Sequence, residues 1–478
     1  MSEIWLIIFR IAFILIFILA LIPVLVLLER KISAFIQDRP GPNRADIAGI
    51  RLGGLVQALA DALKLAIKED FTPGAIRSKA LFTIAPMVLF LMSTLTIAVI
   101  PFSEYFTIDG VKHLMQAIPF DGGLLWYLGF ASLSIYGIML AGWSSNNKYS
   151  LLGSLRAASG AISYEIPLGL AVVSMILTYN SISLNDFVIA QQGSFLGLPA
   201  WGIFVQPLAA IIFIACAFAE TNRAPFDLAE GESEIVAGYH LEYSAMSFAM
   251  FFMAEYIAMT AMSALVVTIF FGGYSLPYLS QADLATHYKI VLLSIASITT
   301  LIGLLFIWWV SKNNVTRYKI AKDHRKRENK LYYALTIMIV VAIDIVCLYF
   351  YNGSLGEFGA EVVATAVNLV VFALKTFVML LIFIWVRWTL PRFRYDQIQD
   401  FNYYNVENTS TGEGQKKYSE SGIEIIFRCP IDENGWTNNQ VNGGRIHPYV
   451  PKIRIPFEKN TDDANCGGLA KAHLNKLF

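Results

Sequence analysis

The stretch ETNRAPFDLAEGESE, residues 220–234, gathers five carboxylates around a single arginine. Pro225 suits the first turn of a helix. In a helix that starts there, Asp227, Glu230 and Glu234 lie on one face, at spacings i, i+3 and i+7. Like charges held this close raise one another's pKa values, so the cluster could accept and pass protons near neutral pH. The alternative is a solvated acidic face, which is what most charge runs are.

Ionisable residues also occur inside apolar stretches, where a charge is costly and usually faces a protein interior or a water-filled path. Glu165 in SGAISYEIPLG and Glu255 in MFFMAEYIAM are such residues, and we interpret both as functional continuations of the acidic cluster. Arg10 and Lys375 fit either a functional role or simple pairing and snorkelling. The sequence leaves the role of Asp344 open.

The elements that must position these residues are membrane-spanning helices. Of the 478 residues, 56% are hydrophobic and 15% are charged, whereas about a quarter are charged in a typical soluble protein. An apolar window of about 20 residues can cross a bilayer as a helix. The sequence contains nine such windows, at 4–28, 80–101, 124–143, 157–179, 201–219, 244–271, 288–310, 332–351 and 362–390. The predicted fold is therefore an all-α, multi-pass membrane protein of about nine spans.

Lys and Arg residues favour the cytoplasmic side of a membrane, and they divide the connections between the windows into two sets. The segments 29–79 and 311–331 hold nine and eight of them, whereas 180–200 and 272–287 hold none. This alternation predicts an N-terminus outside the cell and places the acidic cluster and the C-terminal tail inside it.

The segment GLVQALADALKLAIKED, residues 54–70, predicts an amphipathic helix. Leu55, Leu59, Leu63 and Ile67 lie on one face, and charged residues lie on the other. The helix is too charged to cross the membrane, so we expect it to lie along the cytoplasmic interface, against neighbouring subunits, or both.

The remaining polar segments carry no recognisable chemistry. The basic linker 311–331 is a topological feature, because a charge run alone does not make a nucleic-acid site. The tail 401–478 contains two short predicted strands, GIEIIFRC and KIRIPF. The four cysteines form no CxxC pair, so we expect no iron–sulfur or zinc site from this chain alone.

Several long segments together resemble the ND-one family, the H-type membrane subunits of respiratory complex I, the NADH:quinone oxidoreductase. They are the acidic stretch with its continuation through MFFMAEY, ERKISAFIQDRPGPNRAD with QALADALKLAIKE, LLGSLRAASGAISYEIPLGL, and WVRWTLPRFRYDQ. The resemblance covers about residues 1–275 and 365–397. It implies a subunit of the bacterial inner membrane that forms most of the quinone chamber, anchors the hydrophilic arm and links quinone reduction to proton translocation.

The resemblance also implies partners and residue roles. The substrate is a quinone, ubiquinone or menaquinone, and the flavin and iron–sulfur clusters belong to partner subunits, with membrane lipid around the chain. The implied proton-coupling residues are Glu165, Glu220, Asp227, Glu230, Glu232, Glu234 and Glu255. The implied quinone-chamber residues are Glu29, Arg30, Lys31, Arg39, Arg44, Asp61, Lys64, Glu69 and Arg223. No residue is expected to be catalytic in isolation or to bind a metal.

Two features depart from the family pattern. The windows 288–310 and 332–351 look like an inserted pair of spans. After Gln397 the family continues into a further span, whereas this chain continues as IQDFNYYNVEN, through either a lineage-specific replacement or a change of reading frame. The predicted organisation is a quinone-chamber and coupling core at 1–275, an insertion at 276–361, a final family-like helix at 362–397 and a tail of unknown role at 398–478.

Two other functions are open on the sequence alone. One is the related membrane subunit of an energy-converting hydrogenase, which uses no quinone, and the other is a stand-alone ion transporter. The DRPGPNRAD loop and the QALADALKLAIKE helix favour the quinone-dependent complex. A transporter is disfavoured because the sequence shows no inverted repeat or paired broken helices, and because the carboxylates gather at one membrane face.

Overall fold

The computed structural model describes residues 3–47, 51–108, 111–195, 197–313, 325–352 and 356–393. These ranges belong to one compact unit, Met1–Phe393. The two strands predicted in the polar tail and the centre of the basic linker lie outside them.

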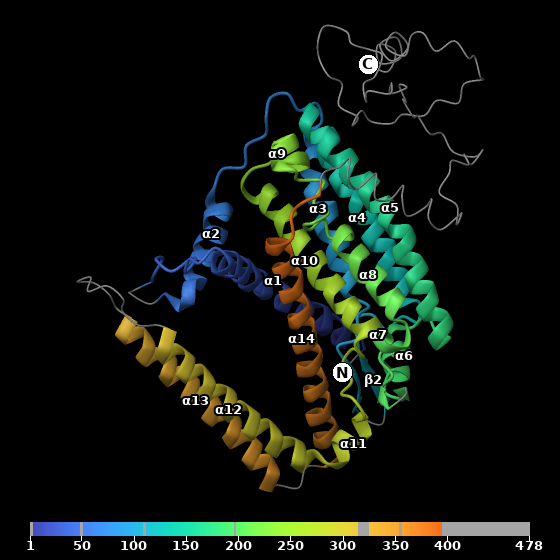
Figure 1. Cartoon of the computed structure of the whole chain (residues 1–478), viewed down its shortest axis with the longest axis vertical. Coiled ribbons are helices and arrows are strands. Elements are labelled where there is room, and N and C mark those ends of the chain that lie inside the picture. The colour runs from blue at the N-terminus through green and yellow to red at the C-terminus, as the bar shows by residue number, and fades with distance from the viewer. Residues whose placement is uncertain are drawn as a thin grey trace, which may run out of the picture. The chain divides into compact units, whose positions relative to one another are not determined.

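The described part is almost wholly helical, as predicted (Figure 1). Within it, seven helices are long and apolar enough to cross a membrane. They are α3 (Lys79–Ile97), α4 (Gly123–Ser144), α5 (Lys148–Tyr179), α10 (Ala245–Phe270), α12 (Tyr288–Asn313), α13 (Arg325–Asn352) and α14 (Glu357–Thr389). The first predicted window lies inside α1 (Glu3–Ile36), a further apolar helix of 34 residues. The chain is therefore a multi-pass membrane protein.

The window 201–219, which predicts one span, does not form one continuous helix. It forms α7 (Gly202–Val205) and α8 (Pro207–Glu220), separated at Gln206, where φ is −133° and ψ is 67°. The break has a local cause, because the ring of a proline disfavours helical geometry in the residue before it. The 14 residues of α8 rise only about 21 Å, less than the roughly 30 Å of a bilayer's hydrocarbon core.

Shorter elements connect the long helices. They are η1 (Leu52–Gly54), α2 (Leu55–Ile67), β1 (Ser103–Ile108), β2 (Val111–Met115), α6 (Leu184–Ala190), β3 (Ser194–Phe195), β4 (Leu198–Pro199), α9 (Glu232–Ile235), η2 (Gly238–His240) and α11 (Gln281–Thr286). Helix α2 is the predicted amphipathic helix.

The antiparallel hairpin of β1 and β2 was not predicted. Its Thr107 N–H donates to Glu361 of α14 at 3.0 Å, which fixes the hairpin against the start of that helix.

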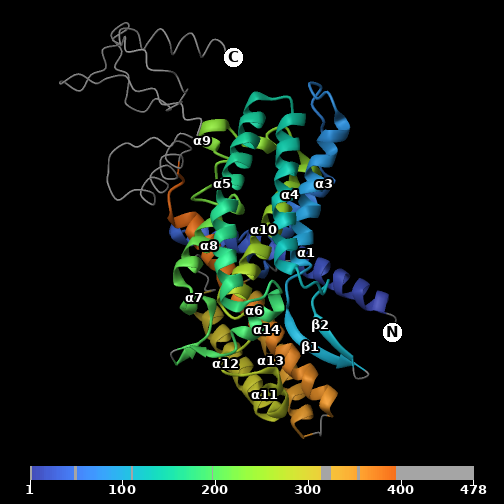
Figure 2. The same cartoon turned by 90° about the vertical axis from the view of Figure 1, so that its right-hand side faces the viewer.

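Helix α10 is the central element of the core. In its apolar window 67% of the residues are buried, against 39% or less in the other spans, and it contacts α1, α3, α8 and α14 (Figure 2). Its C-terminal end is capped from α14. The Lys375 ammonium donates to the carbonyls of Phe271, Gly273 and Ser275 at 2.9, 3.0 and 2.7 Å. Such carbonyls need donors at a buried helix end, so Lys375 has a structural partner.

The other isolated intramembrane charges also have local partners. Arg10 donates to the Gln116 carbonyl at 3.3 Å. Asp344 of α13 accepts from Thr299 and Thr300 of α12 at 3.3 and 3.1 Å, which joins the two helices. Helices α12 and α13 pack chiefly against each other, and only 11% and 6% of their apolar windows are buried. For Lys375 and Asp344 the structure favours simple pairing, whereas the Nε and Nη2 atoms of Arg10 are buried without a hydrogen-bond partner.

Candidate functional site

The acidic loop between α8 and α9 does not continue as a helix from Pro225, so the predicted common face of Asp227, Glu230 and Glu234 is wrong. Helix α8 ends at Glu220, the loop 221–231 runs as turns, and α9 begins only at Glu232. The loop is folded tightly against the segment that follows it. At Gly238, where φ is +63°, a Cβ atom would lie 1.8 Å from the Ala229 carbonyl oxygen, so only glycine fits there.

Arg223 of this loop lies at the centre of a group of buried charges. Its side chain is 3% exposed, and its guanidinium lies 3.5 Å from Glu29 of α1 and 3.8 Å from Glu255 of α10. It also lies over the ring of Tyr256, at 4.7 Å from the centroid. Burial by itself would lower the pKa of Arg223, but the carboxylates of Glu29 and Glu255 raise it, so this arginine stays charged.

Glu29 is shared between elements that are far apart in the sequence. Besides Arg223, it accepts a hydrogen bond from Arg387 of α14 at 2.6 Å and one from the Tyr256 hydroxyl at 2.5 Å. Charge-assisted hydrogen bonds of this kind are what a buried carboxylate requires. Glu29 therefore ties α1, α10 and α14 to the acidic loop.

Two loop carboxylates extend the group. Asp227 is 2% exposed and forms an ion pair with Arg392, beyond the end of α14, at 2.6 Å. Its Oδ1 also accepts from the backbone N–H of Glu230 at 3.3 Å, and the Glu230 carboxyl lies 3.7 Å from His240. Burial raises the pKa of Asp227, while Arg392 opposes that rise. Burial and the neighbouring Asp227 raise the pKa of Glu230 to about 6.

Glu255 connects the loop to the centre of the membrane core. It accepts from the Tyr239 hydroxyl at 2.9 Å and lies 3.8 Å from the Arg223 guanidinium of the loop. Glu230, in the same loop, lies near enough to interact electrostatically with Arg223. We call this connected group the ionic network, which consists of Glu29, Arg223, Asp227, Glu230, Glu255, Arg387 and Arg392.

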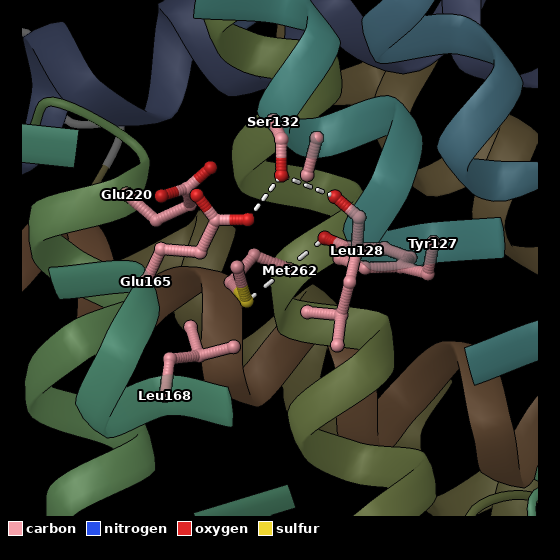
Figure 3. Close-up of a pocket in the computed structure, with 8 residues that line it drawn as sticks. Tyr127, Leu128, Ser132, Glu165, Leu168, Glu220 and Met262 are labelled. Atoms are coloured by element: carbon pink, nitrogen blue, oxygen red, sulfur yellow. Dashed lines mark hydrogen bonds between the residues drawn. The ribbon is translucent and has the colours of Figure 1, made fainter. Parts of the chain in front are cut away.

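Glu165 and Glu220 come together at a separate small cavity of about 10 Å³ (Figure 3). Ser132 of α4 donates to the Glu165 carboxylate and lies 2.8 Å from the Leu128 carbonyl. The Glu220 Oε2 atom is buried and has no hydrogen-bond partner. A space of this size is close to what one water molecule needs, and polar groups line it on two sides. The cavity therefore suits a water that links the two carboxyl groups.

The remaining predicted residues lie nearer the surface. Arg30 and Asp61 form an ion pair between α1 and α2, with side chains 46% and 30% exposed. Lys31 donates to the Pro40 carbonyl at 3.1 Å, and Glu234 pairs with Arg156 of α5 at 2.6 Å. The predicted residues that are simply exposed are Arg39, Arg44, Lys64 and Glu69. Glu232 begins α9.

Helix α2 turns its apolar face outward. Leu59, Leu63 and Ile67 are 42%, 62% and 81% exposed, although they belong to the hydrophobic side of the helix. An exposed apolar stripe of this kind needs lipid, a partner subunit or an apolar ligand to cover it. This agrees with the predicted position at an interface.

Sequence reasoning missed several members of the site. Arg387 and Arg392 were visible only as part of WVRWTLPRFRYDQ, and no role was assigned to either. Tyr239 and Tyr256 carried no signal, because a tyrosine near an apolar run is common.

Within the described ranges, no group of His, Cys, Asp and Glu side chains is large enough to hold a metal ion.

Long apolar helices packed around buried ion pairs define a multi-pass membrane protein with an ionic network between its helices. The chain belongs to the NADH dehydrogenase family, whose sequence model matches residues 9–325 and 329–409. It is 37% identical over 403 residues to the H subunit of the NADH-quinone oxidoreductase of Bdellovibrio bacteriovorus, covering 80% of this chain and 87% of the relative. It is 36% identical over 420 residues to the H subunit of Leptospira biflexa, covering 86% and 90%.

A third relative, an NADH-quinone oxidoreductase H subunit of Solibacter usitatus, is 40% identical over 379 residues, with 78% of this chain and 86% of the relative covered. The resemblance seen in the sequence motifs is confirmed. The chain is a membrane subunit of the NADH:quinone oxidoreductase complex, and other subunits of that complex are its partners.

Proposed function

We propose that this subunit borders the path of the quinone and couples quinone reduction to proton translocation through the ionic network. The observation that carries the proposal is the ion pair between Arg223, in the acidic loop, and Glu255, inside α10, at 3.8 Å. It joins a loop charge to an intramembrane one. Because Arg223 also pairs with Glu29, and Asp227 contacts Glu230 in the same loop, a change of charge at the loop must redistribute protons or ion pairs along the network.

The chemistry of the substrate fits this arrangement. Reduction of a quinone to a quinol takes up a pair of electrons and a pair of protons. We propose that partner subunits carry the flavin and the iron–sulfur clusters, while this chain supplies acidic groups that gain and lose protons. The Glu165–Glu220 cavity provides a further step of the same kind, through a bound water. Whether the quinone is ubiquinone or menaquinone depends on a pocket that the partners complete.

The proposed quinone path runs beside α2, and a substitution of Asp61 tests this placement. Asp61→Ala frees Arg30 and removes the acceptor of Gln57, so we expect quinone reduction to fall about twofold to fivefold, because an exposed ion pair contributes up to about 1 kcal/mol. NADH oxidation with an artificial acceptor should stay unchanged, since the flavin is on another subunit. Asp121→Ala, the same change at an exposed position outside α2, is the control. Equal loss of both activities in Asp61→Ala would instead indicate failed assembly.

We also propose the orientation that the Lys and Arg distribution predicts, with the N-terminus outside a bacterial inner membrane and the tail inside. A cysteine replacing Lys312, at the end of α12, should react with a membrane-impermeant reagent only from the cytoplasmic side. A cysteine replacing the exposed Leu279, in a connection without basic residues, should react only from outside. The reverse pattern in inside-out and right-side-out vesicles would reject this topology.

A further inference from the structure

Glu328 is an unusual residue in an otherwise exposed part of the fold. Only 6% of the apolar window of α13 is buried, yet Glu328, near the start of that helix, is 4% exposed. Glutamate is among the residues that are almost never buried unless they are paired. The partners of Glu328 therefore indicate what the beginning of α13 does.

Those partners lie in the turn that leads into α2. The Glu328 carboxylate accepts from the backbone N–H of Arg51 at 3.2 Å and from the Tyr332 hydroxyl at 2.9 Å. The Tyr332 hydroxyl lies beside Gly53, 4.0 Å from where a Cβ atom of that glycine would be. In Figure 1 this end of the α12–α13 hairpin lies toward α1 and α2, while the other end adjoins α11. The hairpin thus contacts the rest of the fold at both of its ends.

The turn that Glu328 contacts has an unfavourable backbone geometry. Leu52, Gly53 and Gly54 have φ values of 47°, 65° and 104°, and a non-glycine residue such as Leu52 rarely adopts this region. A Cβ atom at Gly54 would lie 2.5 Å from the Pro42 carbonyl oxygen, so glycine is required there. Residues held in such conformations persist only where surrounding structure fixes them.

Helix α2 also lacks an N-terminal cap of its own. Its N-cap residue is Gly54, which has no side chain to accept from the first backbone N–H groups. The negative charge of Glu328 lies at this N-terminal side, where the helix dipole favours an anion. Glu328 therefore adds an external contact just before a helix end that the local sequence leaves uncapped.

We propose that the α12–α13 hairpin is a brace for α2, in which Glu328 and Tyr332 are positioning residues that hold the turn 51–54. The brace sets the direction in which α2 leaves that turn, and with it the position of Asp61 and of the exposed apolar stripe. Its effect on quinone reduction rests on the proposed role of α2 beside the quinone path.

The test compares Glu328→Ala with Glu328→Gln in the assembled complex. Hydrogen–deuterium exchange of peptides covering 51–67 should be about tenfold faster in Glu328→Ala, since 1.4 kcal/mol corresponds to a factor of ten and a hydrogen bond to a charged group contributes at least that. Peptides covering 103–115 should not change. Glu328→Gln keeps an acceptor oxygen for Arg51 but loses the negative charge, so exchange should lie between that of the wild type and that of Glu328→Ala. Quinone KM should rise about threefold or more in Glu328→Ala, with kcat little changed.

The outcomes separate the brace from the role of α2. Unchanged exchange at 51–67 in Glu328→Ala overturns the brace. Faster exchange with an unchanged quinone KM supports the brace and overturns the placement of α2 at the quinone path. If Glu328→Ala fails to assemble, Tyr332→Phe, which removes only the hydroxyl between Glu328 and Gly53, should show the same changes at smaller size, and wild-type exchange there would also overturn the brace.

Discussion

Glu255→Gln is expected to reduce NADH:quinone turnover by about 10²–10⁴-fold, the range typical of a lost acid–base group, while the subunit remains in the membrane. Glutamine keeps the size of the side chain and can still accept from Tyr239. It cannot take up or release a proton, so the intramembrane end of the ionic network loses its titratable group. The measurement is NADH:quinone activity together with proton uptake, in membranes whose subunit content equals that of the wild type.

Glu234→Gln is the matched control for this variant. Glu234 pairs with Arg156 at the surface of α5, and its side chain is 30% exposed. An exposed pair of this kind contributes little, so we expect a much smaller effect on turnover than in Glu255→Gln. Wild-type turnover and proton uptake in Glu255→Gln would reject the coupling role of the ionic network. The acidic loop would then be a docking surface for the hydrophilic arm.

Arg223→Met should prevent normal accumulation of the subunit. Methionine fills a comparable volume, but it leaves Glu29 and Glu255 facing each other without the central positive charge. Removing one partner of a buried ion pair typically destabilises a protein by about 3–5 kcal/mol, a large fraction of the whole stability of a fold. We expect strongly reduced subunit content in the membrane, measured by immunoblotting, and a loss of assembled complex on native gels.

Arg30→Met provides the comparison at the surface. It also removes an arginine from an ion pair, but Arg30 is 46% exposed, and exposed pairs contribute about 0–1 kcal/mol. Subunit content should therefore stay near that of the wild type. The double variant Arg223→Met with Glu255→Gln also removes the carboxylate that loses its arginine partner, since Glu29 keeps Arg387, and it should recover part of the lost content. Normal accumulation of Arg223→Met alone would show that the network contributes little to stability.

The sequence by itself determined the architecture and the carboxylates of the site. Apolar windows predicted the spanning helices, and the period of Leu55, Leu59, Leu63 and Ile67 predicted α2, because both patterns are local along the chain. The motifs pointed to the family, which the relatives confirm. The carboxylates that form the ionic network were all named from the sequence. Local patterns failed where prolines interrupt them, at Gln206 before Pro207 and in the loop around Pro225.

Only the tertiary structure decided which charges meet. Glu29 was grouped with the quinone chamber, yet it pairs with Arg223 and with Arg387, which is 358 residues away along the chain. Glu234 was grouped with Asp227 and Glu230, yet it pairs with Arg156 on another helix. The free energy of hydrophobic burial is proportional to the apolar area removed from water, so it follows from composition. An ion pair instead requires two particular side chains within about 4 Å of each other. That distance is set by the packing of whole helices, so composition and spacing predict the helices but not the pairs.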